Sequence, residues 1–73
     1  EAVELRVSER TRYHDVPLKD IQLKPNILLA CISRRERIII PGGGDVMMPG
    51  DTVVVVTLAG RVILDLNDIF QES

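Results

Sequence analysis

The chain has 73 residues, a length that accommodates one small domain. It carries nine Lys and Arg against eleven Asp and Glu, a formal net charge of −2, and no basic run to follow a phosphate backbone, so we expect no nucleic-acid partner. The apolar fraction of 45% excludes a disordered chain, and an aromatic fraction of only 3% leaves Val, Ile and Leu to build the core.

The single cysteine and the lack of long apolar runs indicate a cytosolic protein. Cys31 lies in the apolar run 27–32 and has no partner for an intrachain disulfide, so we predict a buried, reduced thiol. No run approaches the roughly 18–20 apolar residues of a membrane span, and the start does not resemble a signal peptide. Because the chain opens inside an apparent strand at Ala2, we expect a neighbouring domain upstream.

The N-terminal third predicts one strand and one short helix. Apolar and polar residues alternate over 2–8, which is typical of a peripheral strand with one wet face. A polar loop follows over 9–15. Residues 17–23 begin with proline and space Leu18 and Ile21 three apart, as in a short helix.

The middle of the chain predicts a β-hairpin. Residues 27–33 are apolar at nearly every position and indicate a strand covered on both faces. Arg34-Arg35-Glu36 forms the turn, although it lacks the Asn-Gly sequence that two-residue hairpin turns favour. Residues 37–40 return as the antiparallel mate, and Pro41 ends that strand.

A turn, a strand and a helix are expected in the last third. Pro49-Gly50 occupies the central positions of a type II turn, where glycine supplies the positive φ, and residues 52–58 form a strand rich in valine. Asp65 is placed to cap a closing helix over 62–71. Four apolar residues at i, i+4, i+7 and i+8 spacing would form one stripe on that helix: Val62, Leu66, Ile69 and Phe70.

These elements assemble into an α+β fold, a small and mostly antiparallel sheet with two short helices. The strands 27–33 and 53–57 need cover on both faces, and two short helices cover only one. Exposed Val or Ile side chains would each forgo roughly 1.5–3 kcal/mol of burial, a large loss for a small domain. The sequence therefore predicts a homodimer.

We find no pattern of an enzyme or of a metal site. His14-Asp15 is a lone pair in a loop, and Gly42-Gly43-Gly44 lacks the Lys-Ser/Thr that follows a phosphate-binding loop. Asp65 and Asp68 are spaced as partners of a helix N-terminus, not as a catalytic pair. We therefore predict a non-catalytic binding module without a cofactor or metal of its own.

A cluster of arginines marks the one candidate site. Arg34, Arg35 and Arg37 surround the hairpin turn beside isoleucine-rich strands. Two interpretations remain open at this point, an ordinary solvated turn and an anion-binding rim over an apolar floor. Under the second, we expect a small anionic ligand at a dimer interface, bordered by five residues: Arg34, Arg35, Ile38, Ile40 and Pro41.

Nearly the whole chain, taken as one domain over 1–73, resembles the TrkA-C (RCK-C) domain, a C-terminal regulatory module of potassium-uptake proteins. The resemblance is carried by the order of LKDIQL at 18–23, ILLACISR at 27–34, RIIIPGGGDVMMPGD at 37–51, TVVVVT at 52–57 and LNDIF at 66–70. One departure concerns the hairpin, because family members usually carry glycine where this chain has Arg35-Glu36.

The resemblance implies a cytoplasmic domain that follows a dinucleotide-binding Rossmann domain, which would hold a nucleotide such as NAD or ATP. The two form a subunit at the inner face of the membrane that gates a potassium transporter. The C-terminal domain dimerises in such families and can bind a regulatory ligand, in some relatives cyclic di-AMP. Two alternatives remain: a purely structural dimerisation module of a transporter or antiporter subunit, and the sensory domain of a transcription regulator.

Overall fold

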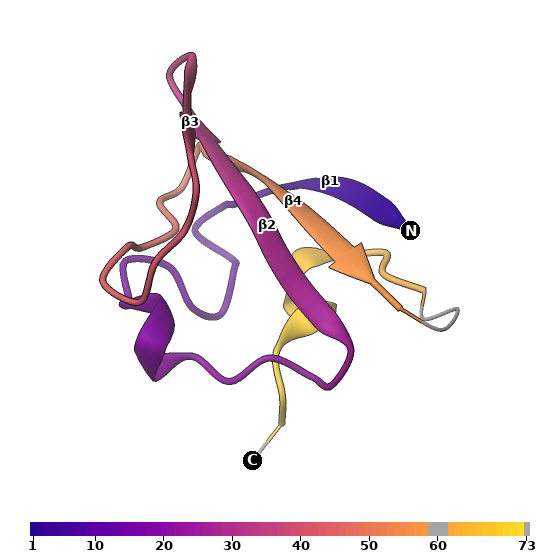
Figure 1. The fold of residues 1–73 in the computed structure, drawn as a ribbon. Coiled ribbons are helices and arrows are strands. Elements are labelled where there is room, and N and C mark those ends of the chain that lie inside the picture. The colour runs from indigo at the N-terminus through magenta and orange to yellow at the C-terminus, as the bar shows by residue number, and fades with distance from the viewer. Residues whose placement is uncertain (59–61, 73) are drawn as a thin grey trace.

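In a computed structural model that describes residues 1–58 and 62–72, four antiparallel strands form one sheet. The strands lie in the order β1-β4-β2-β3 (Figure 1). Their bounds are β1 Ala2–Arg6, β2 Ile27–Arg34, β3 Arg37–Ile39 and β4 Thr52–Thr57. The predicted mostly antiparallel sheet is thus confirmed, and the strand over 2–8 is confirmed as a peripheral one, because β1 lies at an edge.

The central strand β4 alternates strictly between half-buried and buried residues. Val55 of β4 is paired with Val3 of β1 on one side and with Leu29 of β2 on the other, so these three side chains share the inner face. A β-bulge shifts the register of β2 between Leu29 and Cys31. Such bulges bend a strand and increase its twist.

The hydrophobic core lies against the inner face of the sheet. Its buried residues come from the strands β2 and β4, from the loops and from the C-terminal segment, and only Phe70 among them is aromatic. Phe70 meets the ring of Tyr13 edge-on, with the centroids 4.9 Å apart. The fully or nearly fully buried apolar residues are Val7, Leu29, Ile32, Met47, Val53, Val55, Ile63, Leu66, Ile69 and Phe70.

On the outer face of the sheet, several large apolar side chains are exposed in the part of the chain that the structure describes. Leu28 of β2 and Ile38 of β3 are 61% and 66% exposed, and Ile40, which follows β3, is 76% exposed. Cys31 is a free, half-buried thiol paired with Val54 on this face, so the prediction that it is buried is wrong for a single copy. The apolar pattern of β2 and β4 therefore has one face in the core and one face in contact with solvent.

The helix predicted over 17–23 is wrong, because only a 3-10 turn forms there, η1 at Leu18–Asp20. The backbone that follows η1 instead forms hydrogen bonds with the C-terminal segment. The Lys24 amide donates to the Ile69 carbonyl at 2.9 Å, and the Gln71 amide donates to the Gln22 carbonyl at 2.9 Å. Backbone groups engaged in this way are withdrawn from a helical ladder, and the chain leaves η1 in an extended conformation.

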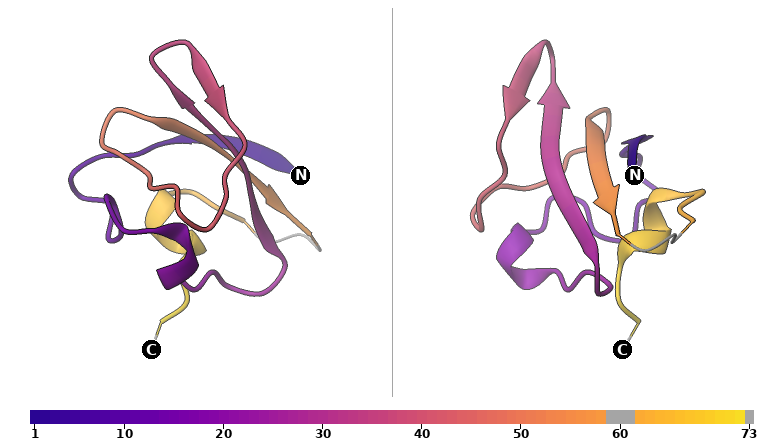
Figure 2. Two further views of the ribbon diagram at one scale, coloured as in Figure 1. Left: turned by 60° about the vertical axis from the view of Figure 1, so that its left-hand side comes forward. Right: turned by 45° about the vertical axis from the view of Figure 1, so that its right-hand side comes forward.

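The prediction of a closing helix over 62–71 is also wrong, because only a 3-10 turn forms there, η2 at Leu66–Ile69. Asp65 occupies the N-cap position as predicted, and its amide donates to the Asp68 carboxylate at 3.1 Å. Val62 does not share the predicted apolar stripe, since it is 72% exposed. Both 3-10 turns lie toward the end of the molecule opposite the tip of the hairpin (Figure 2).

The predicted β2–β3 hairpin is confirmed and projects beyond the rest of the sheet (Figure 1). Its turn consists of two residues, Arg35 and Glu36, with φ of 50° and 67°. Positive φ at both central positions is the type I′ geometry that matches the twist of the flanking strands. The turn is formed without the Asn-Gly sequence that favours it, so two residues with side chains occupy the left-handed region.

Candidate ligand-binding site

A two-pronged ion pair fixes the base of the hairpin. Arg34, the last residue of β2, donates from Nε to Asp51 Oδ1 and from Nη2 to Asp51 Oδ2, both at 2.9 Å. The same Nη2 donates to the carbonyl of Val46 at 2.8 Å. Asp51 is only 2% exposed, so its charge is compensated in a setting nearly free of solvent.

The ion pair shifts the pKa of both partners. The hydrogen bond to Asp51 raises the pKa of Arg34 above its ordinary value, and burial opposes that change without cancelling it. Burial raises the pKa of Asp51, but the hydrogen bonds from Arg34 and from the Met48 amide together outweigh it and leave that pKa below its ordinary value. Both groups are therefore held in their charged forms.

Local sequence explains how Asp51 reaches this position. Met48, Pro49, Gly50 and Asp51 form a turn in which the Asp51 amide donates to the Met48 carbonyl at 2.9 Å. Gly50 has a φ of 98°, which confirms the glycine predicted at the positive-φ position of this turn. The Met48 amide in turn donates to Asp51 Oδ2 at 2.9 Å, so the carboxylate is anchored by its own turn as well as by Arg34.

The first cavity, which we call the arginine pocket, lies between the hairpin and this turn and has a volume of about 460 Å³. Its cationic wall comes from the end of β2, the hairpin turn and the start of β3. Its other wall comes from the turn that precedes β4. The lining residues are Arg34, Arg35, Arg37, Met48, Pro49, Gly50 and Asp51.

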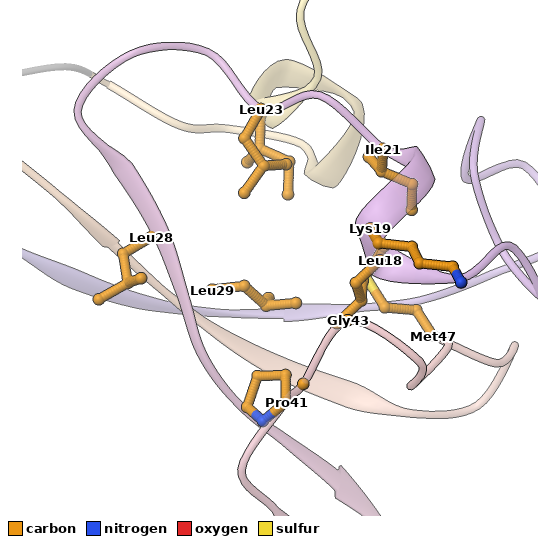
Figure 3. A pocket seen from close by; sticks show the side chains of 11 residues that line it. Leu18, Lys19, Ile21, Leu23, Leu28, Leu29, Pro41, Gly43 and Met47 are labelled. Atoms are coloured by element: carbon orange, nitrogen blue, oxygen red, sulfur yellow. The ribbon is translucent and has the colours of Figure 1, made fainter.

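A second cavity of about 250 Å³, the apolar pocket, lies between η1, the start of β2 and the loop after β3. Leu18, Leu23 and Leu29 gather around it, whereas the ammonium group of Lys19 extends away from them (Figure 3). The remaining lining residues are Ile21, Leu28, Pro41, Gly42, Gly43, Met47 and Ile69. A cavity with this mostly apolar lining offers contacts to an apolar group.

The five residues of the candidate site lie in three places within one copy. Arg34 and Arg35 line the arginine pocket, and Pro41 lines the apolar pocket. Ile38 and Ile40 line neither cavity and are exposed. The residues that the sequence analysis grouped around one ligand therefore share the hairpin and its continuation, but not a common cavity.

Sequence reasoning identified the arginines but missed the residues that face them. The sequence analysis gave Asp51 no partner, whereas the structure pairs it with Arg34. The floor of the apolar pocket was also missed, because Leu18 and Ile21 were assigned to a helix. Among residues 1–58 and 62–72, no group of three or more His, Cys, Asp or Glu side chains is arranged to hold a metal ion. No helix in that part of the chain is long and apolar enough to cross a membrane.

The described residues form a four-stranded antiparallel sheet with a projecting, arginine-rich hairpin (Figure 1). The chain is similar to a solved structure described as "Structure of RCK domain with cda", with a TM-score of 0.66 and 22% sequence identity over 75% of this chain and 77% of that chain. The family model for the TrkA-C domain matches residues 2–70. The chain therefore belongs to the TrkA-C domain family, whose members are generally regulatory in potassium transport. A search of the curated proteins gives no significant match.

Proposed function

We propose that this chain is a non-catalytic regulatory domain of a Trk-type potassium-uptake system, which dimerises, senses a small ligand and so gates cation transport. The observation that carries the proposal is an apolar sheet face left in solvent on a member of the TrkA-C family. A ligand changes such a gate only through different affinities for its two states, and a shared dimer interface provides two arrangements to select between.

The occupant proposed for the outer face is a second copy of the chain. Leu28, Ile38 and Ile40 are each more than 60% exposed, and they extend along the edge of the sheet from β2 to the end of β3. Large exposed apolar patches mark interaction surfaces on soluble proteins. A symmetric contact would cover each of these side chains once in both copies, and each covered side chain would contribute about 1.5–3 kcal/mol toward association.

The proposed ligand is a small anion, with cyclic di-AMP as the first candidate, bordered by Arg34, Arg35, Ile38, Ile40 and Pro41. Guanidinium groups bind phosphates by paired hydrogen bonds, and isoleucine and proline side chains provide surfaces for a base. Because these residues share no cavity in one copy, the proposed site is completed by the partner copy across the outer face.

In the complete protein, the domain is proposed to act in the cytoplasm at the inner face of the membrane, beside a potassium transporter subunit. An upstream domain is proposed to bind a nucleotide such as NAD or ATP. The domain described here would then relay the state of its ligand between that nucleotide domain and the transporter.

Analytical ultracentrifugation tests the dimer. The wild-type chain is expected to sediment as a dimer at micromolar concentration, and Ile40→Lys is expected to sediment as a folded monomer. Leu64→Lys is the matched control, because Leu64 is 84% exposed but lies outside the strands. If the wild-type chain stays monomeric at high concentration, or if both variants dissociate equally, the outer face is not the interface.

Calorimetric titration with cyclic di-AMP tests the ligand. Binding is expected to wild type and to be lost in Arg35→Ala, while circular dichroism confirms that the variant is folded. A second candidate function, a structural dimerisation module without a ligand, is favoured by the separation of the five residues into different places. Dimerisation without binding of cyclic di-AMP or other nucleotides would support that function instead.

A further inference from the structure

The arginine pocket has an unbalanced charge. It is lined by three arginines and one aspartate, a formal charge of +2. Asp51 is fully committed to Arg34 and to its own turn, as the bonds at 2.9 Å show. Arg35 and Arg37 have no carboxylate among the other lining residues. A cavity large enough for a small molecule is therefore lined by two arginines with no lining carboxylate left to pair with them.

The strand register adds to this imbalance. Arg34 of β2 is paired directly with Arg37 of β3, so two cations stand opposite each other on one face of the hairpin. Like charges in directly opposite positions destabilise a pair of strands. Asp51 relieves the repulsion at Arg34 only, and an anion between the strands and the turn would relieve it at Arg37.

The hairpin turn holds Arg35 beside the cavity at a cost in backbone conformation. Arg35 and Glu36 hold φ of 50° and 67°, a geometry that asparagine and glycine adopt at much lower cost. Strained backbone of this kind persists where the surrounding structure enforces it and is concentrated at functional sites. Arg35 combines this backbone conformation with a place in the lining of the cavity.

We propose that the arginine pocket binds a tetrahedral dianion, inorganic phosphate or the phosphate group of a monoester, through Arg35 and Arg37. A phosphate group carries about −1.5 to −2 charges at neutral pH, which matches the formal charge of the pocket, and its oxygens suit paired guanidinium hydrogen bonds. The site shares Arg35 with the ligand site of the proposed function, but it lies within one copy and requires neither the dimer nor a cyclic dinucleotide.

Calorimetric titration with sodium phosphate at constant ionic strength tests the site, with sodium chloride as the blank. Saturable binding is expected in wild type, with affinity at least about tenfold weaker in Arg35→Gln and Arg37→Gln, one lost charged hydrogen bond being worth about 1.4 kcal/mol or more. Arg6→Gln, which removes an exposed arginine of β1, is the control and should bind as wild type does. Glu36→Gln removes the acid between the two arginines and should bind more tightly.

Absence of saturable phosphate binding in wild type, or equal weakening in Arg6→Gln, would overturn the site. If wild type binds phosphate, titrations with glycerol phosphate and with vesicles containing phosphatidic acid distinguish a soluble monoester from a lipid headgroup as the source of the phosphate group. Repeating the phosphate titration on the Ile40→Lys variant separates this proposal from the dimer. Binding retained by that variant supports a site within one copy, whereas binding lost with the dimer contradicts it.

Discussion

Arg34 and Asp51, seventeen positions apart in the chain, are joined by two hydrogen bonds of 2.9 Å that connect the β2–β3 hairpin to the turn before β4. Arg34 reaches over the core and is 30% exposed in its side chain, whereas Asp51 is 2% exposed. The pair therefore couples the rim of the arginine pocket to the central strand. Any movement of the hairpin relative to β4 has to stretch or break these bonds.

Asp51→Asn is expected to lower the free energy of unfolding by about 2–3 kcal/mol. The substitution keeps the shape of the side chain but leaves Arg34 without its counter-charge in a partly buried position. Urea denaturation followed by circular dichroism measures the change. Asp20→Asn, at an exposed carboxylate in η1, is the control and should change stability by less than about 0.5 kcal/mol. Equal stability of the two variants would contradict a stabilising role for the pair.

The pH dependence of stability follows from the lowered pKa of Asp51. The folded state favours the charged form of the Asp51 carboxylate more than the unfolded chain does. Its contribution to the free energy of unfolding is therefore present above the unfolded pKa of about 3.9 and is lost as pH falls through the lower pKa of the folded state. The difference in unfolding free energy between wild type and Asp51→Asn should be constant near pH 5–7 and shrink below about pH 4. A difference that persists unchanged into strong acid would contradict this assignment.

The hairpin should become more stable when its turn carries the sequence that the turn geometry favours. Replacing Arg35-Glu36 by Asn-Gly is expected to raise the free energy of unfolding by about 1 kcal/mol, because both φ values are positive.

Gly50→Ala tests the turn before β4 in the opposite direction. Gly50 has a φ of 98° and no atom lies within 4 Å of an added Cβ, so a decrease of about 1 kcal/mol in the free energy of unfolding would come from the backbone alone. A stabilising Gly50→Ala or a destabilising Asn-Gly turn would show that these φ values do not control stability.

The strands could be predicted from the sequence because their pattern is local. Alternation over 2–8 has the period of a strand, and the unbroken β-branched run 53–56 is typical of a strand covered on both faces. Pro-Gly before Asp51 marks the turn that precedes this run. Apolar residues on both faces of β2 also indicated a surface that one copy leaves open. That Leu28 is exposed while Leu29 is buried agrees with this expectation.

The helices could not be predicted, because the interaction that prevents them is not local. Leu23 and Phe70 form an isolated antiparallel bridge between segments almost fifty residues apart. The spacing of apolar residues within one segment does not reveal a backbone partner at that distance. The site was predicted only in part for the same reason. The arginine cluster can be recognised in the sequence. Which of its members pairs with a carboxylate depends on the folded position of Asp51, which pairs with Arg34 and not with Arg35.

Phe70 and Val62 give a direct test of which apolar residues of the C-terminal segment support the fold, since helical spacing placed both on one stripe. Phe70 is fully buried and its ring meets Tyr13 at 4.9 Å, whereas Val62 is 72% exposed. Phe70→Leu is therefore expected to lower the free energy of unfolding by about 1–2 kcal/mol through lost aromatic contact and imperfect refilling of the core. Val62→Ala should change it by less than about 0.5 kcal/mol. Thermal and urea unfolding of the two variants measure both values, and comparable losses would restore a helix with one apolar stripe over this segment.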